Sequence, residues 1–378
     1  MKNITILGAG IVGKAIALDL SKKYYITSLD INSESLESLS GCPNIKTKLI
    51  DISNEKILNE NIRDADLVIS AVPGFLGYQT LINVIKSKKN IVDISFFPED
   101  ALSLNELAKE NNVTAVIDCG VAPGMPNYII GFHNQSMKIE KFYYEVGGLP
   151  KERTLPFQYK SSFSPCDVIE EYTRPARFIE NGKLVTKPAC SDAELVYYKK
   201  IGTLEAFNSD GLRSLLNTMN HIPDMREKTL RYPGHINLIQ ALFTSGFFDK
   251  NPININGIKI TPFDFTSEIL FNTWKSNPGD DEFTVMKICI TGTQNGVKKE
   301  ITYTLFSEYD YKENLSSMAR TTGFTATATA DMILNNLFNE KGIFPPELIG
   351  RHSECFNYVI KYLKQRNINY EKTENIFH

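Results

Sequence analysis

The sequence predicts an α/β protein in which a doubly wound parallel sheet carries an inserted α+β domain built on an antiparallel sheet. Short apolar runs alternate with helical patterns in the first third of the chain, which favours parallel pairing because a parallel crossover needs a long connection. Asn-Gly pairs punctuate strand-like stretches in the second half, and a long helix rich in small residues follows them. These features predict two domains of different kinds.

Six short apolar runs are the expected strands of the parallel sheet. They are Ile4–Leu7, Tyr25–Leu29, Ile45–Ile50, Asp66–Ala71, Asn90–Ile94 and Thr114–Ile117. Helical patterns such as Ala101–Glu110 fill most of the gaps between them. We therefore expect residues 1–125 to form the first domain.

A glycine-rich segment, with Gly8, Gly10 and Gly13, follows the first expected strand and opens the first helix. The second strand ends at Asp30, 22 residues after Gly8. This context predicts a dinucleotide-binding Rossmann domain, in which the glycines permit a tight turn, close approach of the pyrophosphate and close helix packing. The helix N-terminus favours the bound anion. A strand–helix turn without a ligand is the alternative.

Asp30 favours NAD over NADP, because a carboxylate accepts the ribose hydroxyls and repels a 2′-phosphate, and no arginine follows it in Ile31–Ser33. Other ligands of the cofactor are expected at the carboxyl ends of the parallel strands. For Asp51 and Asp93, helix capping or loop solvation is the alternative. The expected NAD-binding residues are Gly8, Gly10, Ile11, Val12, Gly13, Asp30, Asp51, Ile52, Ala71, Val72, Pro73, Asp93 and Gly120.

The pattern changes after Pro123-Gly124. Lys141–Val146 alternates as a strand, and residues 314–337 read as a helix that packs back onto the first domain. We expect residues 126–310 to form a substrate and dimerisation domain, and residues 311–378 to return as C-terminal helices. Three Asn-Gly pairs predict hairpin turns: Asn181-Gly182, Asn256-Gly257 and Asn295-Gly296.

Composition limits the classes of partner. The net charge of −3 gives no basic field for nucleic acid or an anionic membrane, and no apolar run approaches the roughly 20 residues of a spanning helix. The chain opens straight into a strand, so its start does not resemble a signal peptide. The six cysteines are scattered without a CxxC pair, which predicts reduced thiols in a cytoplasmic protein and no metal site. A homodimer is expected, because the edge of an antiparallel sheet is often covered by a partner subunit.

One stretch resembles a known family. Asp118–Met125 reads DCGVAPGM and is similar to the DxGxAPG signature of the saccharopine dehydrogenase-like family. Within that family the chain most resembles the lysine 6-dehydrogenases, for example in LEAFNSDG at residues 204–211. Other stretches match the family in the same order: Val146–Pro150, Gly202–Phe207, Lys228–His235 and Gly342–Glu347.

This resemblance implies NAD-dependent oxidative deamination of the ε-amino group of L-lysine. The product would be 2-aminoadipate semialdehyde, which cyclises to piperideine-6-carboxylate. The ε-amine has a pKa of about 10.4 and must lose a proton before its carbon can give up hydride. The candidate catalytic residues are Asp118, His235 and Lys160. The alternatives are that Asp118 only orients the loop at residues 120–124, that His235 is structural, and that Lys160 is solvated.

The carboxylate of the substrate requires a cationic partner, and Arg231 is the first choice, with a structural salt bridge as its alternative. Tyr232 is a second candidate substrate ligand, and Gly120 and Pro123 are expected near the nicotinamide.

Other functions stay open: a saccharopine dehydrogenase, a carboxynorspermidine-type reductase, or a non-enzymatic NAD-binding regulator. Saccharopine carries three carboxylates and would require at least two cationic clusters. The arginines available for such clusters are Arg153, Arg174, Arg177, Arg213 and Arg226.

Overall fold

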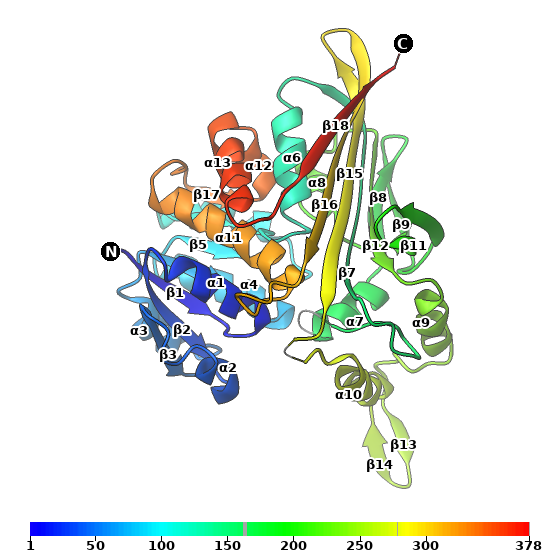
Figure 1. Ribbon diagram of the computed structural model, residues 1–378. Coiled ribbons are helices and arrows are strands. Elements are labelled where there is room, and N and C mark those ends of the chain that lie inside the picture. Colours follow the sequence, from blue (N-terminus) through cyan, green and yellow to red (C-terminus); the bar gives the residue numbers. More distant parts are fainter. Residues whose placement is uncertain (162–164, 278, 378) are drawn as a thin grey trace.

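Two sheets stand beside each other in the computed structural model, which describes residues 1–161, 165–277 and 279–377 (Figure 1). The first sheet has seven strands, all parallel to their neighbours, in the order β17-β6-β5-β4-β1-β2-β3. Its strands are β1 (Asn3–Leu7), β2 (Tyr25–Asp30), β3 (Ile45–Leu49), β4 (Leu67–Ser70), β5 (Ile91–Asp93), β6 (Thr114–Val116) and β17 (Gly342–Phe344). The prediction of a doubly wound parallel sheet is confirmed.

Helices cover both faces of this sheet, as its mostly apolar inner strands require. One face carries α1 (Ile11–Leu20) and α11 (Ser317–Leu334), and the other carries α3 (Glu55–Ile62), α4 (Gly74–Lys86) and α5 (Asn105–Glu110). The shorter segments α2 (Ser33–Glu37) and η1 (Ala101–Leu104) complete this region.

Helix α11 lies close against α1 because its contact residues are small. A Cβ at Gly323 would stand 3.1 Å from Ile16 Cγ1 and 3.4 Å from the Val12 carbonyl oxygen. Ser316 is the N-cap of the helix, and its hydroxyl accepts a hydrogen bond from the Ala319 amide. Beyond α11 the chain adds β17 to the edge of the first sheet, next to β6.

The second sheet has nine strands. Its main path is β10-β11-β12-β7-β15-β16-β18, while β8 pairs with β12 and β9. Its members are β7 (Lys138–Pro150), β8 (Ala176–Glu180), β9 (Lys183–Lys187), β10 (Glu194–Tyr198), β11 (Gly202–Asn208), β12 (Asp224–Arg231), β15 (Glu282–Gln294), β16 (Val297–Glu308) and β18 (Glu371–Ile376). The expectation of an antiparallel sheet needs one correction: β12 and β7 pair in parallel, so the sheet is mixed.

The three Asn-Gly pairs form the predicted hairpin turns. They join β8 to β9, β13 (Ile253–Ile255) to β14 (Ile258–Ile260), and β15 to β16. Both residues of each pair have positive φ, for example 52° at Asn295 and 78° at Gly296. This is the backbone that a two-residue hairpin loop requires.

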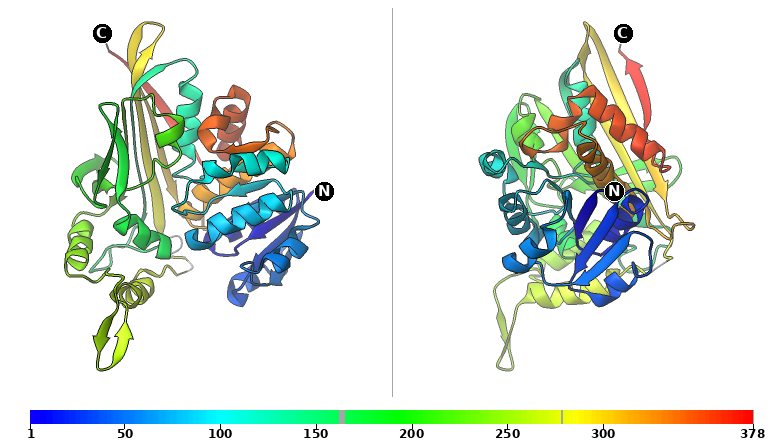
Figure 2. Two further views of the ribbon diagram at one scale, coloured as in Figure 1. Left: turned by 180° about the vertical axis from the view of Figure 1, so that it is seen from behind. Right: turned by 90° about the vertical axis from the view of Figure 1, so that its left-hand side faces the viewer.

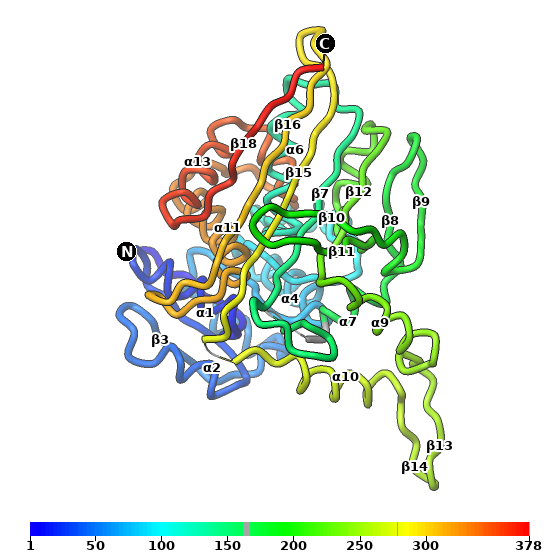
Figure 3. Tube along the Cα trace, turned by 45° about the vertical axis from the view of Figure 1, so that its right-hand side comes forward, coloured from blue at the N-terminus to red at the C-terminus, as the bar shows by residue number. Residues whose placement is uncertain are grey.

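The remaining helices join the two sheets or flank the second one (Figure 2). They are α6 (Met125–His133), α7 (Pro165–Thr173), α8 (Leu215–Thr218), α9 (His235–Thr244), α10 (Pro262–Trp274), α12 (Pro346–Gly350) and α13 (Ser353–Lys364). After α13 the chain crosses to the second sheet, where β18 runs beside β16 (Figure 3). The C-terminal segment therefore contributes to both sheets.

No helix among the described residues is long and apolar enough to cross a bilayer. The same part of the chain contains no cluster of three or more histidine, cysteine, aspartate or glutamate side chains arranged to hold a metal ion.

Candidate active site

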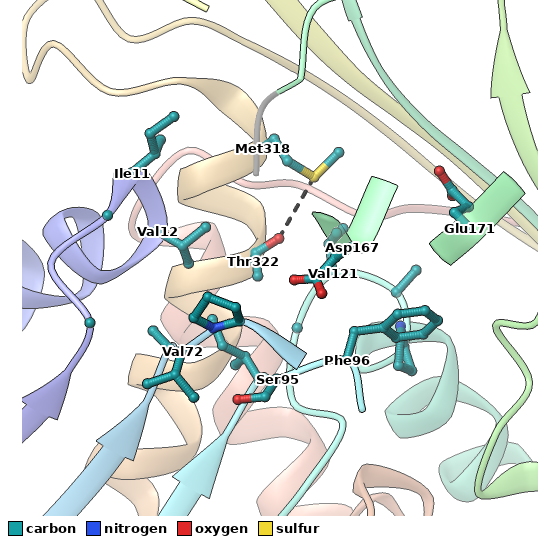
Figure 4. Close-up of a pocket in the computed structure, with 18 of the residues that line it drawn as sticks. Ile11, Val12, Val72, Ser95, Phe96, Val121, Asp167, Glu171, Met318 and Thr322 are labelled. Carbon is teal, nitrogen blue, oxygen red and sulfur yellow. Dashed lines mark hydrogen bonds between the residues drawn. The ribbon is translucent and has the colours of Figure 1, made fainter. Parts of the chain in front are cut away.

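A cavity of about 560 Å³ lies between the two sheets, at the carboxyl ends of the parallel strands. Its walls come from the N-terminus of α1, the loops after β2, β4, β5 and β6, the start of α11, and β7, β12 and α7 of the second domain. Figure 4 shows Ile11 and Val12 of α1 on one side of this space, and Asp167 and Glu171 of α7 on the other. The cavity therefore spans both domains.

The glycine segment has the close packing that its spacing predicts. Gly8 has φ of 96°, and a Cβ there would stand 2.4 Å from the Ala71 carbonyl oxygen. A Cβ at Gly13 would stand 2.0 Å from the Gly8 oxygen, whereas a Cβ at Gly10 would meet nothing within 4 Å. Gly10 is the N-cap of α1 and brings no side-chain cap. The N–H groups that begin α1 thus face a cavity rather than a capping side chain, as a diphosphate site requires.

Asp30 lies beside this segment and fixes it. Its carboxylate accepts hydrogen bonds from the Ala9 amide at 2.6 Å and the Asn32 amide at 2.8 Å. Twelve of the thirteen residues expected to bind NAD line the cavity: Gly8, Gly10, Ile11, Val12, Gly13, Asp30, Asp51, Ile52, Ala71, Val72, Pro73 and Gly120. These residues fit a nicotinamide dinucleotide.

Asp93 is the exception. Its side chain is fully buried and does not line the cavity. It accepts hydrogen bonds from the Ser95 amide at 3.1 Å and the Ser95 hydroxyl at 2.8 Å, and burial raises its pKa to about 7. This placement corrects the prediction that Asp93 binds NAD. The Asp93 carboxyl instead fixes the loop that follows β5, through its hydrogen bonds with Ser95.

Strand β12 supplies the polar wall of the cavity in the second domain. Glu227, Thr229 and Arg231 occupy alternate positions and so share one face of the strand. The Ser209 hydroxyl lies 2.8 Å from one carboxyl oxygen of Glu227 and 2.7 Å from the Thr229 hydroxyl. Thr229 in turn donates to Glu171 at 2.6 Å. One hydrogen-bonded chain thus joins two carboxyl groups.

Glu227 is a titratable group of this wall with a strongly raised pKa. Its side chain is buried, and burial raises its pKa to about 8, with the nearby negative charges of Glu171 and Asp210 adding to the rise. The Gly211 amide donates to Glu227 Oε2 at 3.1 Å. A carboxyl group with such a pKa can exchange protons near neutral pH.

Arg231 lines the cavity, and its guanidinium is already engaged. It donates to Glu171 at 2.6 Å, to the Tyr172 hydroxyl at 2.9 Å and to the Leu230 carbonyl at 2.9 Å. The guanidinium also lies over the ring of Tyr159, with Cζ 4.4 Å from the ring centroid. Arg231 therefore lies at the site, as predicted for a substrate ligand, and also forms a salt bridge, which was the alternative prediction.

Three other predicted residues lie outside the cavity lining. His235 is 1% exposed, and its two ring nitrogens bond the Tyr172 hydroxyl and the Phe157 carbonyl, so it is not placed to act as a general base. Burial lowers its pKa to about 3. Lys160 donates to the Lys275 carbonyl at 3.3 Å, and the Tyr232 hydroxyl donates to the Pro150 carbonyl. These assignments are corrected, because each side chain is directed to a structural partner instead.

Asp118 lines the cavity but forms a buried ion pair. Arg213 Nε donates to it at 2.7 Å, and Arg213 Nη1 donates to the Phe97 carbonyl at 2.6 Å. Asp118 itself has φ of 53°, an uncommon backbone conformation outside glycine. This geometry supports the alternative in which Asp118 orients the loop that contains Gly120 and Pro123, both of which line the cavity.

The remaining arginines do not enlarge the cationic surface of the site. Arg177 pairs with Asp210, and Arg226 with Glu180. Arg174 lies over the ring of Phe96, and Arg153 over that of Tyr232. Among the described residues that line the cavity, Arg231 is the single arginine or lysine.

Sequence reasoning missed four members of the polar wall: Glu171, Ser209, Glu227 and Thr229. A partial signal was present in β12, where polar residues stand at the alternate positions 227, 229 and 231 and so share one face of the strand, although the intervening Lys228 is also polar and buried. Ser209 and Glu171 carry no such signal, because they approach β12 from separate segments of the chain.

Comparison with known proteins identifies the family. The model described as the saccharopine dehydrogenase C-terminal domain matches residues 117–368, and that of the saccharopine dehydrogenase NADP binding domain matches residues 4–116. The chain belongs to the saccharopine dehydrogenase family. Its first domain is therefore of the pyridine-nucleotide-binding type.

Individual members of the family are distant in sequence. The chain is 28% identical over 265 residues to saccharopine dehydrogenase [NADP(+), L-glutamate-forming] of Schizosaccharomyces pombe, covering 66% of this chain and 59% of that protein. It is 25% identical to the alpha-aminoadipic semialdehyde synthase of Arabidopsis thaliana, covering 63% of this chain and 24% of that protein. The match thus spans less than two thirds of either relative.

The fold of the family is present along nearly the whole chain. The apo saccharopine dehydrogenase (L-Glu forming) of Saccharomyces cerevisiae superposes with a TM-score of 0.80 at 19% identity, covering 99% of this chain and all of that one. The homospermidine synthase of Legionella pneumophila, solved in complex with NAD, superposes with a TM-score of 0.69 at 13% identity, covering 99% of this chain and 91% of that one. At these identities, the likeness establishes the fold.

Proposed function

We propose that the protein is a pyridine-nucleotide-dependent oxidoreductase that removes hydride from a carbon bonded to nitrogen. The observation that carries this proposal is a single cavity that joins the glycine segment of the first domain to the Glu227 wall of the second. Membership of the saccharopine dehydrogenase family supports it.

NAD is the proposed cofactor, and it would supply the hydride acceptor. The glycine segment and the start of α1 would hold its diphosphate, and Asp30 its ribose hydroxyls. The family model is described as NADP binding, so this preference rests on Asp30 and on the cavity having no arginine or lysine near residue 30 among its described lining residues.

Proton removal is the proposed task of the polar wall. A protonated amine has no lone pair to stabilise the iminium ion formed as hydride leaves, so a proton must first leave the nitrogen. Glu227 is the proposed acceptor, since it lines the cavity and titrates near neutrality. Arg231 is the proposed partner of a substrate carboxylate, and the loop at residues 120–123 is proposed to position the reacting carbon.

Saccharopine is the first candidate substrate, because saccharopine dehydrogenases are among the relatives. In that reaction, the oxidised carbon–nitrogen bond is hydrolysed and an amino acid is released. The S. pombe relative's name specifies glutamate as the product.

L-lysine is the second candidate. One observation favours it: Arg231 is the single cationic side chain among the described lining residues, and it already pairs with Glu171. A substrate with three carboxylates would lack cationic partners for at least two of them in such a site. Lysine has a single carboxylate and needs only one such partner.

Formation of reduced nucleotide, followed by its near-ultraviolet absorbance, separates these candidates. The protein should be mixed with NAD or NADP and, in turn, with saccharopine, L-lysine and a carboxylated polyamine. Turnover of any of these amines supports the proposal and identifies the substrate. Tight nucleotide binding without turnover of any amine would favour the alternative of a nucleotide-binding regulator.

The proposed cofactor preference has its own test. Asp30→Ser removes the carboxylate that repels a 2′-phosphate, so the ratio of the Kd for NADP to the Kd for NAD should fall by about tenfold or more. Calorimetric titration of both nucleotides into the wild-type protein and the variant measures this ratio. Equal affinity of the wild-type protein for the two nucleotides would contradict the preference.

A further inference from the structure

The contacts between Glu227, Ser209, Thr229 and Glu171 require one more proton than the two hydroxyls supply. Three contacts link the four groups. Ser209 Oγ lies 3.0 Å and 2.8 Å from the two carboxyl oxygens of Glu227, a forked contact that one hydrogen can serve, and 2.7 Å from Thr229 Oγ1, which lies 2.6 Å from Glu171 Oε1. Each contact needs a hydrogen, but a serine and a threonine bring one each. The third hydrogen must therefore belong to one of the two carboxyl groups.

Glu227 is the carboxyl group that carries it. Glu171 accepts a hydrogen bond from the Arg231 guanidinium at 2.6 Å, which stabilises its ionised form. Glu227 is more deeply buried, and no arginine or lysine is within ion-pairing distance of it in the described part of the chain. Its raised pKa agrees with a protonated carboxyl at pH 7.

The hydrogen bonds then run in one direction. Glu227 Oε1 lies 3.0 Å from Ser209 Oγ and can donate to it, while Oε2 accepts from the Gly211 amide. Ser209 donates to Thr229, and Thr229 donates to Glu171. Every hydrogen in the chain has one acceptor, and both carboxyl groups line the cavity.

We propose that the Ser209 and Thr229 hydroxyls relay a proton between Glu227 and Glu171, which makes both hydroxyls functional parts of the site. The O–H bond of Glu227 breaks as Ser209 gains its proton, Ser209 passes its own to Thr229, and Thr229 passes its own to Glu171. Glu227 is then a carboxylate at the cavity and accepts the proton that leaves the substrate nitrogen. This proposal rests on the proposed function, and the proton that Glu171 gains returns to water between turnovers.

Among the described residues, the other titratable groups around Glu227 do not offer a second route for its proton. Glu171 of α7 and Asp210 of the β11–α8 loop add negative charge, and Asp210 is itself paired with Arg177. From β7, Tyr144 and Tyr143 are close enough to interact with Glu227, but burial raises the pKa of each far above neutral. Both tyrosines therefore stay neutral.

Infrared difference spectroscopy of the substrate-free protein tests the proton count. At pH 7 the wild-type spectrum should contain a carbonyl band of a protonated carboxyl that Glu227→Gln lacks and that disappears near pH 8, in addition to the band of Asp93, whose pKa is raised to about 7. In Thr229→Val the freed Ser209 hydroxyl can donate to the Glu227 carboxylate, so the midpoint of the titration should fall. Thr229→Ser keeps the hydroxyl and should leave the midpoint unchanged. Equal midpoints in the Val and Ser variants, or an ionised Glu227 at about pH 6, would overturn the relay.

Steady-state kinetics with whichever amine is oxidised gives the second readout. Thr229→Val and Ser209→Ala should lower kcat by about tenfold or more with little change in KM, while Thr229→Ser and Ser209→Thr should restore it. Oxidation at equal rates by all four variants refutes the relay and leaves the oxidoreductase in place. If the infrared spectrum shows the shared proton but no amine is oxidised, the proton sharing between the two carboxyl groups is supported and the proposed oxidoreductase function is refuted.

Discussion

At the scale of single residues, burial decides which carboxyl groups can do chemistry. Asp30 and Asp51 lie at the cofactor end of the cavity, where backbone amides satisfy them. Asp118 forms an ion pair with Arg213, and Asp93 is fully buried and does not line the cavity. Glu227 combines a buried carboxyl, a raised pKa and a place on the cavity wall. Residue type alone does not distinguish these five side chains.

The raised pKa of Glu227 predicts a pH-dependent loss of stability. The unfolded carboxyl releases its proton near pH 4.5, whereas the folded one keeps it to about pH 8. The folded state thus binds more protons between these values, and stability should fall as the pH rises through them. Glu227→Gln cannot ionise and should remove Glu227's share of this fall, which is roughly 5 kcal/mol at most.

Thermal unfolding followed between pH 5 and 9 measures this effect. Asp93, whose pKa is raised to about 7, contributes a fall of the same sign, so Asp93→Asn serves as the matched comparison. Parallel curves of melting temperature against pH for the wild-type protein and Glu227→Gln would show that Glu227 is ionised in the fold.

At the scale of elements, the start of α1 depends on glycines for two separate reasons. Gly13 is needed for packing, since its Cβ would stand 2.0 Å from the Gly8 oxygen. Gly10 faces open space, since a Cβ there would meet no protein atom within 4 Å, and this is where we expect the diphosphate. The two positions therefore separate stability from binding.

This difference gives a matched pair of variants. Gly13→Ala should lower the free energy of unfolding by about 1–3 kcal/mol, because the backbone around it must shift. Gly10→Ala should fold with near wild-type stability but bind the nucleotide about tenfold or more weakly, because its methyl group enters the space expected for the diphosphate. Chemical denaturation and calorimetry measure the two effects. Wild-type nucleotide affinity in Gly10→Ala would place the diphosphate elsewhere.

Between the domains, the Asp118–Arg213 ion pair is the contact whose loss has a clear expected cost. Both side chains are less than 10% exposed, at 4% and 7%. Arg213→Met leaves Asp118 buried without its partner and should cost about 3–5 kcal/mol. Adding Asp118→Asn removes the isolated charge and should recover part of that stability. A double variant no more stable than Arg213→Met would show that the hydrogen bond to Phe97, rather than the charge pair, dominates.

At the scale of the whole molecule, one segment projects away from both sheets. The hairpin of β13 and β14 forms a sheet of its own at the lower end of the view in Figure 1. Ile253, Ile255 and Ile258 on it are about half exposed or more, at 50%, 47% and 65%. An isolated two-stranded hairpin is marginally stable in water, and exposed apolar groups of this kind mark interaction surfaces.

We propose that this hairpin contacts a second copy of the chain, so that the protein is a homodimer. Light scattering coupled to size-exclusion chromatography should give twice the chain mass for the wild-type protein. Ile255→Asp with Ile258→Asp should shift the mass to that of one chain. Leu184→Asp, at an exposed position of β9, is the control and should stay dimeric. A monomeric wild-type protein would contradict the proposal.

Sequence patterns were sufficient to predict the features that depend on neighbours along the chain. The spacing of Gly8, Gly10, Gly13 and Asp30 predicted the strand–turn–helix unit at one end of the cavity, because these residues act through local backbone geometry. The three Asn-Gly pairs predicted their hairpins for the same reason.

Tertiary contacts determine which polar side chains lie together at the other end of the cavity. Glu171, Ser209 and Glu227 come from α7, the end of β11 and β12, and they meet because β11 and β12 pair and α7 packs beside them. The same packing turned His235, Lys160 and Tyr232 toward structural partners. Burial and hydrogen-bond partners are set by contacts between distant segments. A sequence pattern can therefore indicate candidate site residues, but the tertiary contacts determine which of them line the cavity.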